Sequence, residues 1–389
     1  MGELFTPIKL SAKKLKAVLG DPKKAAEAIN LIYVHDKQPG IRRLKEGKDF
    51  CYYQGKKKLN DKLTLERIKK LAIPPAWESV WICELENGHL QATGIDTRQR
   101  KQYRYHSSWS SFRNHTKFYR LYEFGKTVPA IRQQLQKDLA KPGLPLEKVL
   151  ATVVYLMEQT SIRIGNAAYE KLYGSFGLTT LKDKHVKISG DHLRLAFIGK
   201  KGIAHNISLK SKKLARIVRQ CRDIPGKELF QYYDEEGNHK AIDSGMVNDY
   251  LKSITGQDFT AKDFRTWIGT VQAIRAFKKL EACKQLEASK PSVSDKELED
   301  CKKLENAITK SEIKRNVLQV LDEVAAHLGN TRAVCKKYYI HPVVIELYEC
   351  NELENYIKEI ESLKRDLENE LLNHEERLLL FILEQKRLI

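Results

Sequence analysis

Four short stretches of the chain place basic residues or tyrosines among apolar neighbours, and they are the candidates for chemistry. They surround Arg163, Lys200, Arg265 and the pair Tyr338-Tyr339. The motifs typical of nucleotide hydrolysis, zinc proteolysis and α/β-hydrolase chemistry (GxxxxGK[ST], GxGxxG, HExxH and GxSxG) do not occur in the sequence. Basic and tyrosine side chains are therefore left to account for any activity.

Taken singly, each of these stretches also has an ordinary structural explanation. An arginine flanked by apolar residues usually faces solvent or pairs with a buried acid. A lysine at a hairpin tip can be a solvated turn, and adjacent tyrosines can belong to a core or to the surface. Other features of the sequence are needed to decide between a catalytic site and these structural explanations.

Composition and charge indicate a folded protein with a polyanionic partner. The chain has 389 residues, 42% of them hydrophobic, which allows two or three domains with real cores and excludes a largely disordered chain. Its net charge is +19, with basic residues in excess over 1–120 and 121–340 and acidic residues in excess over 341–389. This pattern favours nucleic acid as the partner, with a generally basic protein as the alternative.

The sequence predicts no membrane segment, disulfide framework or metal site. The apolar run at 378–383 is among the longest, far short of the roughly 20 residues of a membrane helix. The first residues do not resemble a signal peptide, so an intracellular location is expected. The seven cysteines are scattered without CxxC spacing, which favours reduced thiols.

Hydrophobic patterning predicts a small α+β domain over residues 1–108. Helices are expected over 13–19, 21–29 and 63–71, and strands over 31–34, 49–53, 77–84 and 90–92. Asn87-Gly88 gives the strongest hairpin signal, between residues 81–83 and 90–92.

A mainly helical domain is predicted over residues 109–389. Its helices are expected over 116–124, 127–139, 146–159, 211–222, 244–253 and 264–280. Residues 193–197 and 203–207 read as a β-hairpin with lysines at its tip, because Gly199 and Gly202 suit a tight turn.

The C-terminal part is predicted to hold a charged, exposed helical linker at about 282–311 and acidic helices at about 351–389. The helical stripe there consists of Leu353, Ile357, Ile360, Leu363, Leu367 and Leu371. It is expected to pack on the helical domain, with a partner-binding helix as the alternative. Asn373 and Glu376 resemble a capping box that opens a last helix.

The order arginine, hairpin lysine, Lys-x-x-Arg and tyrosine resembles the type IB DNA topoisomerases, which share a catalytic fold with the tyrosine recombinases. The similarity is closest to the small poxvirus-like and bacterial members. Further matching segments are residues 38–43, 73–77, 91–94, 101–106, 175–181 and 328–331. The resemblance implies an α+β fold, in which a small domain with a β-sheet and a larger, mostly helical catalytic domain with a β-hairpin form a C-shaped clamp on DNA.

The resemblance also implies roles for the catalytic residues. Tyr339 directly precedes Ile-His-Pro and matches the family nucleophile. Arg163 and Arg265 match the two phosphate-binding arginines, and Lys200 matches the hairpin lysine that protonates the leaving oxygen. Tyr338 falls where the family usually has a small residue, and helix neighbours point about 100° apart, so only one tyrosine can face the phosphate.

One position departs from the poxvirus-like and nuclear members, which have histidine where this chain has Asn330. Asparagine can donate a hydrogen bond but cannot carry a positive charge. His327, three residues earlier, is a second candidate for the missing role, and a water molecule is a third.

The implied DNA contacts lie in both domains. They are Lys101, Gln102, Tyr103 and Tyr105 in the first domain and Lys201 and Lys262 in the second. The expected partner is double-stranded DNA, and no membrane, nucleotide, metal or cofactor is expected to take part. The protein is expected to be a monomer in a prokaryotic cytoplasm, associated with the nucleoid.

The implied reaction nicks one strand through a 3′-phosphotyrosine, lets the strand swivel and reseals it without ATP or metal. Two alternatives remain open at this point. One is a tyrosine recombinase-like strand transferase, although its usual histidine near the second arginine is replaced by Lys262. The other is a non-catalytic DNA-binding protein, which would have no use for the aligned tyrosine.

Overall fold

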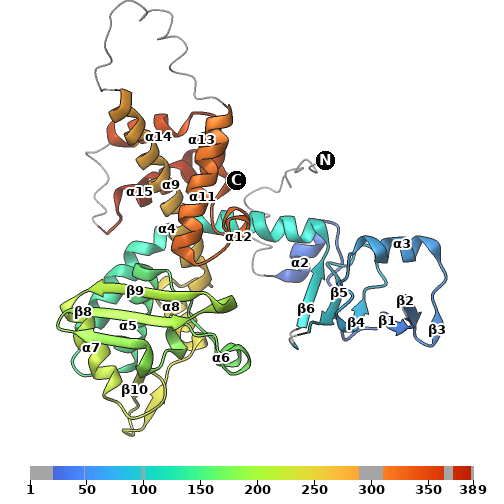
Figure 1. Ribbon diagram of the computed structural model, residues 1–389, viewed down its shortest axis with the longest axis horizontal. Helices are drawn as coiled ribbons and strands as arrows, with labels where there is room; N and C mark the ends of the chain where they lie inside the picture. Colours follow the sequence, from blue (N-terminus) through green and yellow to red (C-terminus); the bar gives the residue numbers. More distant parts are fainter. Residues whose placement is uncertain are drawn as a thin grey trace, which may run out of the picture. The chain divides into compact units, whose positions relative to one another are not determined.

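The structure is a computed structural model that describes residues 21–47, 49–97, 99, 101–288, 310–362 and 371–386. The chain divides into two compact units that meet between Arg120 and Leu121. The boundary falls inside the long helix α4 (Ser107–Ala140), drawn in turquoise in Figure 1. Each unit has hydrophobic core residues of its own.

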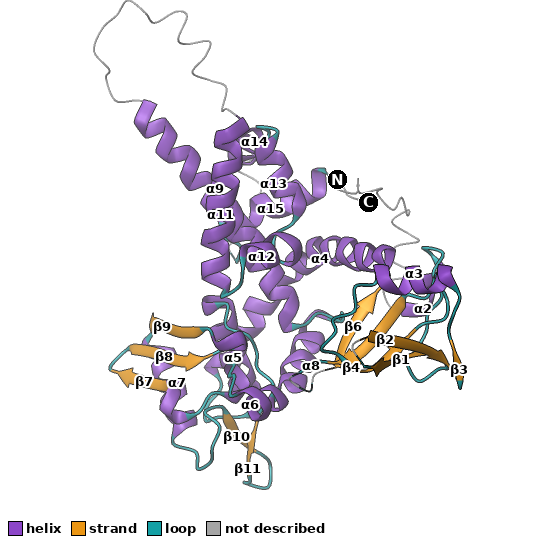
Figure 2. Ribbon diagram, turned by 45° about the vertical axis from the view of Figure 1, so that its right-hand side comes forward, coloured by secondary structure: helices purple, strands orange, loops and turns teal. Residues whose placement is uncertain are grey.

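The N-terminal unit is built on an antiparallel sheet of six strands in the order β3-β2-β1-β4-β5-β6 (Figure 2). The strands are β1 (Ile41–Glu46), β2 (Asp49–Gln54), β3 (Lys57–Lys58), β4 (Glu78–Ile82), β5 (Leu90–Ile95) and β6 (Lys101–Tyr105). The helices are α2 (Pro22–Glu27), α3 (Lys62–Lys70) and the first turns of α4. Ile41, Ile82 and Ala92 from three neighbouring strands pack with Ile68 of α3. The order leaves β6 at an edge of the sheet.

Most of the elements expected in this unit are confirmed. Asp21 caps α2 by accepting from the Lys23 amide at 2.9 Å, and Pro22 takes the first helical position, where no N–H is needed. The strand expected at 31–34 is wrong, because only Ile32 forms an isolated bridge, with Gly88. β4 and β5 pair as the expected hairpin, but residues 83–89 connect them as a longer loop instead of a tight Asn-Gly turn. The helix expected over 13–19 lies outside the described residues.

The second unit is mostly helical, with two small sheets. Its helices are the rest of α4, α5 (Leu146–Thr160), α6 (Ala167–Tyr173), α7 (Lys212–Arg222), α8 (Ser244–Thr255), α9 (Ala261–Ala288), α11 (Lys310–Leu328), α12 (Arg332–Tyr338), α13 (Pro342–Glu349), α14 (Leu353–Ser362) and α15 (His374–Gln385). One sheet has the order β7-β8-β9, and the strands are β7 (Val186–Ser189), β8 (His192–Ile198) and β9 (Ala204–Lys210). The other pairs β10 (Gln231–Tyr233) with β11 (His239–Ala241). One continuous core joins α4, α5, α9, α11 and the C-terminal helices.

The expectation of two helices at 116–124 and 127–139 is wrong, because α4 runs through both without a break. Gly125 lies against Trp267, and a Cβ at this position would be only 2.4 Å from the Trp267 ring. Pro129, four residues later, removes one helical hydrogen bond. Phe124, just before Gly125, and Val128, just before Pro129, are fully buried, so core packing holds the helix together through both interruptions.

The last helix is fastened to the rest of the unit by a buried carboxylate. Asn373 and Glu376 form the expected capping box, with bonds of 3.0 and 2.9 Å. Arg132 of α4 binds both oxygens of Glu376, at 2.7 and 2.8 Å, and the Trp267 indole donates to the same carboxylate at 3.1 Å. Because Trp267 belongs to α9, this network ties α15 to α9.

The prediction that the acidic C-terminal helices pack on the helical domain is confirmed for α14 and α15, whose apolar residues join the main core. Two stripe residues, Leu363 and Leu367, lie outside the described residues. Of the linker expected over 282–311, the structure describes α9 up to Ala288 and α11 from Lys310, and residues 289–309 lie outside the described part.

Within the described ranges, three further expectations from the sequence can be compared with the structure. No helix there is long and apolar enough to span a bilayer. No group of three or more His, Cys, Asp and Glu side chains in those ranges could hold a metal ion. The described cysteines Cys51, Cys83, Cys221, Cys335 and Cys350 are free thiols.

Candidate active site

Helix α9 positions Tyr339. The Arg265 guanidinium carbon lies 5.1 Å from the centre of the Tyr339 ring, and Arg265 is only 5% exposed. One turn along the same helix face, a Cβ on Gly269 would lie 2.6 Å from the Tyr339 carbonyl oxygen. Thr270 accepts the backbone N–H of His341 at 3.1 Å. The backbone from the Tyr339 carbonyl to the His341 amide is therefore held by one stretch of α9.

Gly269 was not singled out from the sequence, although glycine inside a long helix is a recognisable signal. Glycine costs about 1 kcal/mol relative to alanine in a helix interior, so it usually has a packing reason there. Here the reason is the close approach of the Tyr339 backbone. The same close approach makes Gly269 a test of how tightly the tyrosine is placed.

Gly269→Ala is expected to slow DNA cleavage about 10²-fold, because the added methyl group displaces the tyrosine from its position beside Arg265. DNA binding should change little. Single-turnover cleavage and a binding titration measure the two quantities. Gly245→Ala, at an exposed helical glycine whose nearest neighbour is the end of the Asp243 side chain, is the matched control. Equal activity of both variants and the wild type would contradict this placement.

Arg163 follows α5 in an extended loop. The helix ends at Ser161, which has a left-handed φ of 56°. The Leu178 amide then donates to the Arg163 carbonyl at 2.9 Å. Gly165 and Gly177 approach so closely that a Cβ on Gly177 would lie 2.5 Å from the Gly165 Cα. The loop carrying Arg163 is therefore held by backbone contacts.

The turn between α11 and α12 brings Asn330 to Arg163. Gly329 ends α11 with a φ of +57°, a conformation that favours glycine. Arg163 Nη2 donates to Asn330 Oδ1 at 2.6 Å and to the Gly329 carbonyl at 3.2 Å. His327 instead has its Nε2 3.0 Å from the Ser161 hydroxyl. Of the two candidates for the missing histidine, Asn330 is the one that contacts Arg163.

Arg265 is buried between the carboxyl ends of two helices. It donates to the Ser161 carbonyl after α5 and, at 2.7 Å, to the Leu328 carbonyl at the end of α11. Helix carboxyl ends carry partial negative charge, which compensates part of the cost of burying a cation. Its Nε is buried and has no hydrogen-bond partner among the described residues.

The site carries positive charge that its own residues do not neutralise. Burial lowers the pKa of Arg163 to about 10, and the neighbouring Arg265 contributes to the lowering. Arg163 nevertheless stays charged at neutral pH. Within the described residues, the acceptors of both arginines are carbonyl and amide oxygens, not carboxylates. Two guanidinium groups beside a phenol are suited to an anionic ligand such as a phosphate, which guanidinium forks bind bidentately.

Lys200 lies at the tip of the β8–β9 hairpin, as expected. The strands pair up to Ile198 and Ala204, and the tip closes through the Gly199 amide, which donates to the Ile203 carbonyl at 2.7 Å. Lys200 Nζ lies 5.5 Å from the centre of the Tyr169 ring on α6. Lys201, with a φ of 65°, and Lys262, in the first turn of α9, are exposed.

Tyr169 was not singled out from the sequence. Its helix follows Arg163 closely, and Tyr169 and Leu172 are exposed apolar side chains on that helix. The spacing of Tyr169 and Tyr173, four residues apart shortly after Arg163, is the sequence signal that could have indicated it.

The residues expected to contact DNA in the N-terminal unit lie on β6. Tyr103 and Tyr105 point to the same face, with parallel rings 5.9 Å apart, and both are nearly half exposed. Lys101 pairs with Asp36, and Gln102 donates to Asp96 at 2.9 Å. The two tyrosines therefore offer an aromatic surface at the sheet edge, whereas Lys101 and Gln102 already have polar partners.

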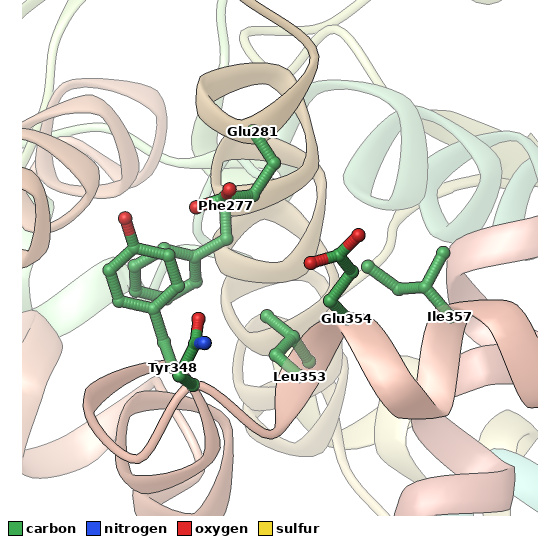
Figure 3. A pocket seen from close by; sticks show the side chains of 7 residues that line it. Phe277, Glu281, Tyr348, Leu353, Glu354 and Ile357 are labelled. Carbon is green, nitrogen blue, oxygen red and sulfur yellow. The ribbon is translucent and has the colours of Figure 1, made fainter. Parts of the chain in front are cut away.

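The pocket drawn in Figure 3 lies elsewhere, between α9, the end of α13 and α14. Phe277 and Tyr348 stack there with ring centres 4.1 Å apart, and the carboxylates of Glu281 and Glu354 line it. None of the candidate catalytic residues is among its lining residues. Two carboxylates would repel a phosphate, so this pocket is not the nucleic-acid site.

A tyrosine beside a buried arginine, with a second arginine and a lysine-bearing hairpin in the same unit, is the arrangement that the resemblance to enzymes cleaving DNA strands with a tyrosine leads one to expect. Two families share this chemistry, and comparison with known proteins separates them. Residues 106–368 match the family model described as eukaryotic DNA topoisomerase I, catalytic core. Residues 49–96 match the family model described as bacterial DNA topoisomerase IB, N-terminal domain.

Individual relatives agree with the family models. The DNA topoisomerase 1B of Acanthamoeba polyphaga mimivirus is 32% identical over 319 residues, covering 80% of this chain and 88% of the relative. The DNA topoisomerase 1 of rabbit fibroma virus is 23% identical over a match that covers 76% of this chain and 86% of the relative. The DNA topoisomerase 1B of vaccinia virus (strain Copenhagen) is 29% identical over 160 residues, or 40% of this chain and 49% of the relative.

The chain belongs to the type IB DNA topoisomerases, of the small bacterial and viral kind. The family resemblance and the α+β architecture expected from the sequence are confirmed, and the topoisomerase family takes precedence over the recombinase alternative. The activity is that of the family, a DNA topoisomerase that relaxes supercoils by breaking and resealing one strand.

Proposed function

We propose that Tyr339 is the nucleophile and that Arg163, Arg265, Lys200 and Asn330 act on the phosphodiester that it attacks. The observation that carries the proposal is the contact of the buried Arg265 with the Tyr339 ring, one turn from the glycine that admits the tyrosine backbone. In the reaction, the phenol oxygen forms a bond to phosphorus, and the bond to the 5′ oxygen breaks. The product is a 3′-phosphotyrosine and a 5′ hydroxyl.

Arg163 and Arg265 stabilise the charge that develops on the non-bridging oxygens in the five-coordinate transition state. Arginine stays protonated at any working pH, and its planar fork fits two oxygens at once. Fixed donors of this kind contribute roughly 10²–10³ in rate each. Asn330 shares in this role through its bond to Arg163, which orients the guanidinium. Its amide nitrogen donates one hydrogen bond to the Leu328 carbonyl at 3.3 Å, which leaves the second N–H for a phosphate oxygen.

Lys200 is the general acid. A departing 5′ alkoxide is strongly basic, so a positioned proton donor lowers the barrier. A hairpin tip allows the ammonium group to approach bound DNA and then withdraw. Lys201 beside it and Lys262 at the start of α9 are assigned to flanking phosphates, which fix the position of the duplex without reading its sequence.

Resealing needs neither ATP nor a metal ion. One phosphodiester bond is exchanged for another, so the bond energy is retained in the covalent complex. Attack by the 5′ hydroxyl, with Lys200 now accepting its proton, reverses the first step. Between the two steps the cut strand swivels, which removes supercoils of either sign.

The substrate is double-stranded DNA, held by both units. In the N-terminal unit, Tyr103 and Tyr105 supply exposed aromatic surface, and Lys101 and Gln102 exchange their present acidic partners for DNA. The C-shaped clamp, the monomeric state and the location in a prokaryotic cytoplasm at the nucleoid belong to the same proposal. The net charge of +19 supports DNA as the substrate, because a basic protein attracts a polyanion.

Relaxation of a supercoiled plasmid in excess EDTA without ATP tests this function. We expect complete relaxation of both positively and negatively supercoiled DNA. Raising the salt concentration should first speed turnover by releasing the product and then suppress it, because binding through several phosphates falls steeply with salt. A requirement for divalent ions or nucleotide, or relaxation of only one sign of supercoil, would contradict the proposal.

A further inference from the structure

His205, on β9, lies between the lysine hairpin and the turn that carries Asn330. On one side, a Cβ on Gly199 would be 2.7 Å from the His205 ring atoms Cδ2 and Nε2. On the other, a Cβ on Gly329 would be 3.1 Å from His205 Cε1. The imidazole therefore touches both the residue that precedes Lys200 and the residue that precedes Asn330.

The missing side chain at Gly199 is required by His205 and not by the backbone. Gly199 has φ −92° and ψ −166°, an extended conformation that any L-residue adopts. Only the imidazole occupies the space that a methyl group would need. At Gly329 the positive φ of 57° favours glycine for its own reason, and the imidazole fills the open space beside that turn.

The ring is held in place by stacking. His205 and Phe197, which pair across β8 and β9, have ring centres 4.9 Å apart and planes 18° apart. The contacts that hold the ring on Phe197, Gly199 and Gly329 are those of packing. Burial lowers the pKa of His205, and Arg163 and Arg265 lower it further. The imidazole is therefore uncharged at neutral pH and adds no positive charge that would attract the phosphate away from the arginines.

We propose that His205 is a positioning residue that docks the base of the lysine hairpin on the Gly329–Asn330 turn and so sets where Lys200 delivers its proton. This inference rests on the proposed role of Lys200 as the general acid. It assigns His205 no contact with the DNA and no proton transfer of its own.

The test is single-turnover cleavage by the full-length protein of two DNA duplexes that differ only in the leaving atom at the scissile bond, 5′ oxygen or 5′ sulfur. A thiolate leaves without a proton donor, so a defect in placing the acid disappears on the sulfur substrate. His205→Ala should cleave the oxygen substrate about 10²-fold more slowly than the wild type and the sulfur substrate at nearly the wild-type rate.

Three further variants sharpen the result. His205→Phe keeps a flat ring on Phe197 and should restore most of the rate on the oxygen substrate. Gly199→Ala pushes the ring away and should show the same oxygen-specific defect, with no added loss when combined with His205→Ala. His192→Ala, at the opposite, exposed end of the same strand pair, is the matched control and should be unchanged.

Two outcomes overturn the inference: unchanged oxygen cleavage by His205→Ala, or equal slowing on both substrates. Lys200→Ala, assayed alongside, separates this failure from that of the proposed function. If sulfur rescues Lys200→Ala but not His205→Ala, the assignment of His205 is wrong and that of Lys200 stands. If it rescues neither, the acid role of Lys200 is wrong, and the inference on His205 fails with it.

Discussion

Tyr339→Phe is expected to abolish plasmid relaxation while leaving DNA binding nearly intact. The substitution removes only the phenol oxygen, so the ring keeps its contact with Arg265 and the backbone keeps its bonds to α9. Loss of a nucleophile costs about 10⁴-fold or more, because the remaining site has no group to take its place. Relaxation assays and binding titrations of the same preparation measure both effects.

Tyr338→Phe is the matched control for the nucleophile. Tyr338 is the last residue of α12 and is 39% exposed, with Lys337 Nζ 5.4 Å from its ring centre. Tyr339 instead contacts the buried Arg265. We therefore expect Tyr338→Phe to relax plasmid at close to the wild-type rate. Inactivation by Tyr338→Phe with retained activity of Tyr339→Phe would show that the neighbouring tyrosine is the nucleophile.

Lys200→Ala should slow cleavage of an ordinary duplex by about 10²–10⁴-fold, the usual contribution of a general acid. On a duplex with a 5′-sulfur leaving group the rate should return to near the wild-type value. Single-turnover cleavage of both duplexes measures this. Lys187→Ala, an exposed lysine of the same sheet on β7, controls for the loss of one positive charge.

If Lys200 served only to bind DNA, sulfur substitution would not rescue its variant, and higher protein concentration would. The comparison therefore separates proton donation from electrostatic binding. Absence of sulfur rescue at saturating protein would move the acid role to another group.

Local elements were predictable from the sequence where short-range signals determine them. The hairpin around Lys200 follows from two alternating segments joined by glycines, and the Asn373–Glu376 capping box from its spacing. These interactions join residues close in sequence. Patterning alone therefore placed both correctly.

What patterning missed depends on contacts between distant segments. Gly125 and Pro129 are helix-breaking signals, yet α4 continues because its buried face packs against α9 through Trp267. Residues 31–34 look like a strand, but the bridge from Ile32 goes to the distant Gly88. No local signal shows where such a partner lies.

The candidate site shows the same division. The residue types of the site came from the family resemblance, whereas their support came from glycines far apart in the sequence. Gly269 admits the Tyr339 backbone, and Gly199 and Gly329 flank His205. A glycine's function as an empty space is visible only once its neighbour is in place.

The most direct test of the central claim is to trap the reaction with denaturant and identify the amino acid bound to DNA. Wild-type protein is mixed with a duplex labelled at each end, stopped with detergent, digested with protease and analysed by mass spectrometry. We expect one DNA-linked peptide, joined through Tyr339 to a 3′ phosphate, with a 5′ hydroxyl on the other fragment. A peptide linked through another residue, a linkage to the 5′ end, or no linked peptide would contradict it.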